Sequence, residues 1–106
     1  MPQYRVRPDA ERDIFAQAAY YEEKGSRETA VRWLVAAYET FDQIAAGRRI
    51  GEKWPSNLRA FRDIRVTSVI DFPGQIVVYR VTAAGVVVLR VRGGRENLDR
   101  ILGPRR

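Results

Sequence analysis

The chain has 106 residues, a usual length for one domain, and 45% hydrophobic with 30% charged residues is typical of a globular protein. It contains no cysteine and no histidine, which excludes disulfides, thiolate sites, histidine bases and histidine-bound metals. The net charge is +6, and the whole excess lies from Leu58 onward, where ten arginines face four acidic residues. A solubilising basic surface accounts for this distribution less well than an acidic protein partner or a nucleic acid does.

The N-terminal half predicts a strand followed by a helical hairpin. Residues 4–7 alternate apolar and basic side chains, as a half-buried strand does. Pro8 suits the first turn of a helix, Gly25 a helix end and Ser26 the N-cap of the next helix. The second helix, which Gly47 should end, carries an apolar stripe formed by Ala30, Trp33, Leu34, Ala37, Phe41, Ile44 and Ala45. Two helices with so short a connection must run antiparallel.

Acidic residues cluster at the start of the first helix. Asp9, Glu11 and Asp13 are close in sequence, and a metal site is one interpretation of this cluster. Carboxylates also favour the positive end of a helix dipole, and alternate residues of a helix do not share a face. A helix start is therefore the better interpretation.

The C-terminal half changes to the two-residue period of strands. Residues 60–66, 75–81 and 86–91 are predicted strands, with turns at 71–74 and 83–85. The predicted fold class is α+β: an N-terminal strand, an antiparallel helical hairpin, then a three-stranded antiparallel sheet packed on the helices, in one domain over the whole chain.

The last predicted hairpin has two different faces. A three-residue loop ending in a left-handed Gly85 pairs Thr82 with Val86, Arg80 with Val88 and Val78 with Arg90. One face is then apolar and should pack on the helices: Val77, Tyr79, Val81, Val87, Leu89 and Val91. The other mixes apolar residues with arginines: Ile76, Val78, Arg80, Val86, Val88, Arg90 and Arg92. Another chain or a terminal segment of this one would cover the mixed face, unless its valines are simply tolerated in a solvated strand.

Two loop features have competing interpretations. Trp54, beside Pro55, is either a contact residue or a lid over the end of the core. Gly93 and Gly94 lack the spacing of a phosphate-binding loop, so a structural turn is favoured.

The arginines of the second half admit three functions: a solvated surface, an RNA-cleaving surface, or a docking surface for an acidic, partly disordered peptide. RNA cleavage would need a proton-transfer residue. Tyr79 is the one tyrosine of this half, and it falls on the predicted core face. The mixed face favours peptide docking, and no catalytic residue is predicted.

Three local sequences give the chain a family resemblance. Residues 8–14 look like the opening Pro-x-Ala-x-x-Asp-Leu motif of the ParE/RelE toxin superfamily, residues 78–81 like its central strand, and residues 89–97 like the ParE closing motif. The chain therefore resembles the ParE branch of these toxin–antitoxin toxins. It departs from the pattern at Arg7, where a serine is usual, and at Gly93, where the motif has histidine.

The resemblance implies a binding function. Arg95 matches an arginine of the RNA-cleaving RelE branch, but Ile76 and Ile101 stand near positions where that branch has its arginine and tyrosine. A ribosome-dependent mRNA endoribonuclease and a catalytically silent, antitoxin-binding relative remain the alternatives. The ParE branch implies inhibition of DNA gyrase by binding, without enzymatic activity, cofactor or metal.

The resemblance also implies a ParD-like antitoxin, which has an acidic C-terminal segment and itself contacts DNA. The predicted antitoxin-binding residues are Arg80, Arg90, Arg92, Arg95, Val78 and Val88, and the predicted target-binding residues are Arg65, Trp54 and Arg100. The N-terminal residues lack the apolar segment of a signal peptide, and no apolar run could span a bilayer. A cytoplasmic protein with no membrane contact is expected.

Overall fold

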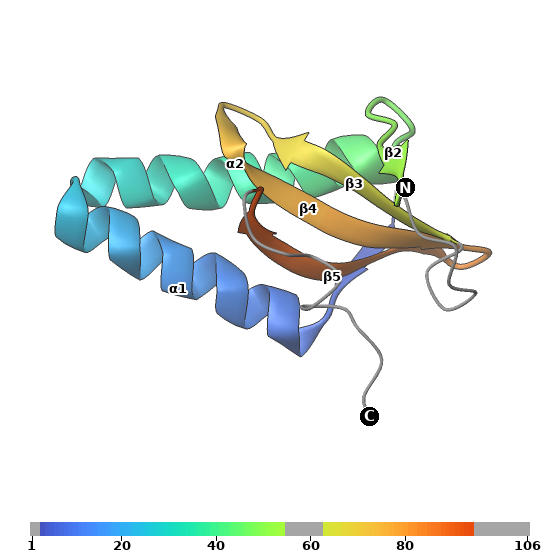
Figure 1. Ribbon diagram of the computed structural model, residues 1–106, viewed down its shortest axis with the longest axis horizontal. Coiled ribbons are helices and arrows are strands. Elements are labelled where there is room, and N and C mark those ends of the chain that lie inside the picture. Colours follow the sequence, from blue (N-terminus) through green and yellow to red (C-terminus); the bar gives the residue numbers. More distant parts are fainter. Residues whose placement is uncertain (1–2, 55–62, 95–106) are drawn as a thin grey trace.

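The helices and strands follow the predicted order. The computed structural model describes residues 3–54 and 63–94. In chain order the elements are β1 (Tyr4–Val6), α1 (Pro8–Lys24), α2 (Arg27–Ala45), β2 (Glu52–Lys53), β3 (Ile64–Val69), β4 (Phe72–Thr82) and β5 (Gly85–Gly93). The predicted α+β class is confirmed, with the helical hairpin on one face of a twisted sheet (Figure 1). The predicted strand residues 60–62 lie outside the described residues.

The sheet has five strands rather than three, in the order β1-β5-β4-β3-β2. β1 joins one edge parallel to β5, and β2 joins the other edge antiparallel to β3. A parallel pair needs a long crossover, which the helical hairpin and the strands after it provide here. β2 has only two residues, too few to leave an alternating pattern in the sequence.

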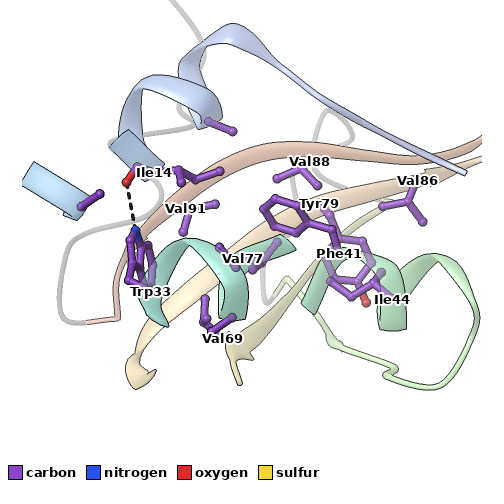
Figure 2. Close-up of a cluster of buried hydrophobic side chains, with 14 of the residues drawn as sticks. Ile14, Trp33, Phe41, Ile44, Val69, Val77, Tyr79, Val86, Val88 and Val91 are labelled. Atoms are coloured by element: carbon purple, nitrogen blue, oxygen red, sulfur yellow. Dashed lines mark hydrogen bonds between the residues drawn. The ribbon is translucent and has the colours of Figure 1, made fainter. Parts of the chain in front are cut away.

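The helix boundaries agree with the sequence signals. Gly25 follows α1, and the Ser26 Oγ caps α2 by accepting a hydrogen bond from the backbone N–H of Thr29 at 3.1 Å. The indole Nε1 of Trp33 donates to the carbonyl of Ile14 at 2.9 Å (Figure 2). This bond joins the two helices and satisfies the one polar group of a fully buried side chain.

The main core lies between the helical hairpin and the sheet (Figure 2). Its buried residues are Ala10, Ile14, Ala18, Ala30, Trp33, Ala36, Ala37, Phe41, Ile44, Val69, Val77, Tyr79, Val86, Val88 and Val91. The predicted α2 stripe belongs to this core, with Leu34 and Ala45 partly buried at its margin. The buried Thr40 hydroxyl accepts from the N–H of Ile70 at 3.0 Å and so ties α2 to the turn after β3.

The turn between β3 and β4 lies earlier than residues 71–74, where it was predicted. Val69 already pairs with Phe72, and Asp71 has a φ of 65°. Aspartate tolerates this left-handed conformation better than most residues. Pro73, which suggested the turn, instead lies near the start of β4, a position where strands accept proline.

The predicted hairpin register was wrong over the half nearest the loop. Thr82 pairs with Gly85, so the loop has two residues rather than three. The register then shifts at a β-bulge, with Leu89 as the extra residue, and Val78 faces Arg90 as predicted. The run of apolar residues in β5 contains no alternation that could have located the bulge.

The bulge changes which residues face the helices. Val86 and Val88 join the main core, whereas Leu89 packs on the opposite face of the sheet. Val81, predicted to be buried, is 52% exposed. The predicted apolar face is therefore correct for Val77, Tyr79 and Val91 and wrong for Val87 and Leu89 in β5. Val81 does lie on the helix-bearing side, but beyond the core.

Candidate partner-binding surfaces

The face of the sheet away from the helices carries a second apolar cluster. Trp54, Ile64 and Val78 are buried in it, and the partly buried Val66, Ile76 and Leu89 pack against them. The backbone N–H of Trp54 donates to the carbonyl of Ile64 at 2.8 Å. Trp54 is only 8% exposed. Of its two interpretations, the lid fits this position, although Trp54 covers the second cluster rather than the end of the main core.

Two of the predicted arginines belong to the strands beneath this cluster. Arg80 follows Val78 by two residues in β4, so it points to the same face. Arg92 pairs across the sheet with Ile76. Within the described part of the chain, both helices lie on the other side of the sheet (Figure 1). We call this side, with Ile76, Leu89 and Arg80, the open sheet face.

The side chain of Asp13 in α1 binds both the backbone and the side chains of β5. The Asp13 carboxylate accepts from the Arg90 guanidinium at 2.7 and 2.9 Å, from the Val91 N–H at 3.1 Å and from Arg92 at 3.4 Å. The side chain of Asp13 is 9% exposed and that of Arg90 is 20% exposed. The hydrogen bonding of Arg90 to Asp13 raises the pKa of Arg90 above its usual value, although partial burial and the charge of Arg92 oppose the shift.

This contact changes the interpretation of Asp13 and Arg90. The helix-start interpretation of Asp13 did not anticipate a partner far along the chain. The one sequence signal was the opening motif of the resemblance, which includes this aspartate. Because Arg90 already has an internal carboxylate, it offers a partner less uncompensated charge than its position in the sequence suggested.

The two predicted valines do not form one surface. Val78 lies in the second cluster and Val88 in the main core, on opposite sides of the sheet. Each is 0% exposed, so neither presents its side chain to solvent. On the open sheet face, Ile76 and Leu89 are the partly buried apolar residues beside the arginines.

Of the predicted target-binding residues, Arg65 and Trp54 are close in the sheet, since Arg65 pairs with Lys53, but their side chains lie on opposite faces. Arg65 donates to the carbonyl of Gly51 at 2.8 Å, beside the edge strand β2, whereas Trp54 is buried in the second cluster. Arg95 and Arg100 lie outside the described residues. Arg49, which the sequence did not single out, donates to the Ser68 carbonyl at 2.9 Å and to the hydroxyls of Thr67 and Ser68.

The tyrosine considered for proton transfer is buried and hydrogen-bonded to the backbone. Tyr79 is 2% exposed, on the core face as predicted, and its hydroxyl accepts from the Gly51 N–H at 2.8 Å. Burial raises the pKa of Tyr4 and of Tyr38, with nearby acidic groups adding to the shift. Both tyrosines therefore hold their protons more tightly than usual. Within residues 3–54 and 63–94 no cluster of three or more acidic side chains that could hold a metal ion occurs.

Known proteins share this sequence pattern and fold. The family model of the ParE toxin of type II toxin–antitoxin system, parDE, matches residues 4–98. A solved structure described as the chromosomal ParDE TA system from P. aeruginosa superposes with a TM-score of 0.70 at 18% identity, covering 88% of this chain and 96% of that chain. A comparison with curated proteins finds no match. No described helix is long and apolar enough to cross a membrane.

Proposed function

Because the chain belongs to the ParE toxin family of type II toxin–antitoxin systems, we propose that it inhibits DNA gyrase by binding and that a ParD-like antitoxin neutralises it. Both interactions would take place in the cytoplasm. The observation that carries the antitoxin part of the proposal is the open sheet face, where partly buried apolar side chains lie beside arginines.

An acidic segment that folds on binding suits this face. Its apolar side chains would cover Ile76 and Leu89, and its carboxylates would pair with Arg80 and Arg92. The single Asp13 carboxylate faces both Arg90 and Arg92, so it balances only one of their two positive charges, and Arg92, with its longer contact of 3.4 Å, would offer charge to the segment. The net charge of +6 would speed the association of such a segment. In the sequence, Arg95 comes two residues after the end of β5, and on that ground it remains part of the proposed surface.

The environment of the tyrosines favours a binding function over catalysis of RNA cleavage. RNA cleavage needs a group that exchanges protons near neutral pH. The Tyr79 hydroxyl is buried and hydrogen-bonded to backbone, and the pKa values of Tyr4 and Tyr38 are raised. A RelE-type endoribonuclease is therefore the second candidate.

Gyrase supercoiling and ribosome-dependent mRNA cleavage, measured with the purified chain, test the proposal together. We expect loss of supercoiling with intact mRNA. Cleaved mRNA with normal supercoiling would replace gyrase inhibition by the ribonuclease function. Silence in both assays would point to another target or to a relative that only binds its antitoxin.

The antitoxin surface is tested by the double variant Arg80→Ala and Arg92→Ala. Truncating one partner of a desolvated charge pair costs about 2–5 kcal/mol, so affinity for a ParD-type antitoxin should fall at least tenfold in a calorimetric titration. The matched control is Arg12→Ala, since the Arg12 side chain is 73% exposed on α1. Unchanged affinity of the double variant would remove these arginines from the interface.

A further inference from the structure

A groove of about 390 Å³ opens on the helix-bearing side of the sheet, between the end of α2 and the β4–β5 hairpin. Its apolar wall includes Ile44, Ile50, Val81 and Val86, and its polar wall includes Arg49 and Arg65. The groove is distinct from the open sheet face, because Val86 and Ile44 belong to the main core on the other side of the sheet.

Two of the four residues named in the apolar wall are largely exposed, whereas Ile44 and Val86 are buried. Ile50 is 80% exposed and Val81 is 52% exposed, although both are large aliphatic residues. Two such side chains lining one groove form an apolar surface that contributes little to the core of this chain. Surfaces of this kind commonly bind another molecule.

The polar wall carries two arginines held by neutral acceptors. Arg65 donates to the carbonyl of Gly51, and Arg49 donates to the carbonyl and hydroxyl of Ser68 and to the hydroxyl of Thr67. Among the described residues, no carboxylate forms an ion pair with either guanidinium. Their hydrogen bonds fix both side chains, but residues 3–54 and 63–94 supply no carboxylate to compensate their charges, in contrast to that of Arg90.

The backbone beside the groove is tightly built. A Cβ added to Gly51 would lie 2.5 Å from the Val66 carbonyl oxygen and 2.7 Å from the Tyr79 hydroxyl, so a glycine is needed here. The same glycine positions the carbonyl that holds Arg65. Arginines fixed before binding lose less conformational entropy when a partner arrives.

We propose that this groove binds an acidic amphipathic peptide segment, with an apolar side chain between Ile50 and Val81 and carboxylates on Arg49 and Arg65. A nucleic acid would place phosphates against two aliphatic side chains, whereas such a peptide matches both walls. The identification of this segment with the antitoxin rests on the proposed function. The antitoxin would then contact both sides of the sheet.

The test uses a fluorescein-labelled peptide in which glutamate alternates with leucine, and a second peptide with lysine in place of glutamate. Binding to the full chain is followed by fluorescence anisotropy, and its position by NMR. We expect the acidic peptide to shift the resonances of Ile50 and Val81. The I50E and V81E variants should bind it about tenfold more weakly or worse, since each adds a carboxylate to the groove.

The matched control is V35E, because Val35 is 60% exposed on α2 and does not line the groove. All three sites are exposed, so folding should survive, which circular dichroism would verify. Equal binding by I50E, V81E and wild type, tighter binding of the lysine peptide, or shifts confined to Ile76 and Leu89 would each overturn the proposal. These measurements do not involve gyrase, so failure of the supercoiling assay would count against the proposed function alone.

Discussion

The two edges of the sheet use arginine in different ways. At the β5 edge, β1 pairs only as far as Val88, and Asp13 then binds the Val91 N–H together with Arg90. At the β3 edge, β2 ends its pairing at Val66, and Arg49 then donates to the Ser68 carbonyl. A charged side chain thus occupies the strand edge beyond each short outer strand, where another strand could otherwise pair.

The difference lies in the counter-charge. Arg90 forms an ion pair with the nearly buried carboxylate of Asp13, so its charge is compensated within the molecule. Arg49 and Arg65 have only neutral acceptors among the described residues, so their charges remain available. Residue type alone therefore does not separate a structural arginine from a recognition arginine; the presence of a neighbouring carboxylate does.

Removal of the Asp13 carboxylate should cause the largest loss of stability at either edge of the sheet. Asp13→Ala leaves Arg90 partly buried without its partner and should lower the free energy of unfolding by about 2–4 kcal/mol. Urea denaturation would measure the loss. The control is Asp9→Ala, whose ion pair with Arg12 is exposed and should contribute about 0–1 kcal/mol. Equal losses in the two variants would mean that the Asp13 contacts are not stabilising.

Removal of Arg49 should have a smaller effect. Arg49→Ala deletes hydrogen bonds to neutral groups at a partly buried edge, and we expect a loss of about 1–2 kcal/mol in the same measurement. Arg48→Ala, at an exposed neighbouring position, should change stability by less than about 0.5 kcal/mol. A loss for Arg49→Ala larger than that for Asp13→Ala would reverse the proposed division between the two edges.

Alkaline pH should have the smallest effect on stability, and it should act on two tyrosines rather than on the arginines at the edges of the sheet. The pKa of Arg90 is raised, so its ion pair persists at high pH. Burial raises the pKa values of Tyr4 and Tyr38, first by desolvation and then through acidic neighbours. Their stabilisation is complete below the unfolded tyrosine pKa of about 10 and is lost as pH rises through the folded value.

Stability should therefore decline above about pH 10, and the double variant Tyr4→Phe and Tyr38→Phe should decline less steeply. Thermal unfolding across this pH range would measure the difference. Tyr20→Phe is the control, because Tyr20 is 54% exposed. An unchanged slope in the double variant would assign the alkaline loss to other groups.

Local chemistry made much of the fold predictable. Serine is a favoured N-cap residue, so Ser26 marks the start of α2. The helical spacing of the apolar residues identifies the buried face of α2. The resemblance to ParE toxins, carried by three short motifs, anticipated the family that the match over residues 4–98 establishes.

The candidate site was less predictable. The apolar run of β5 has no alternation that could reveal the bulge at Leu89, so Val88 was assigned to the wrong face. Arg90 was identified as a residue of interest, but its partner Asp13 lies 77 positions away. The groove joins α2, the segment before β2 and the last hairpin, and none of these segments indicates it individually.

The sequence by itself determined the helices, their caps, most strands and the basic charge, because each depends on residues a few positions apart. Only the tertiary structure decided the register at the bulge, the carboxylate that neutralises Arg90 and the groove beside Arg49 and Arg65. These features depend on contacts between distant segments, whose geometry arises only when the helices pack on the sheet.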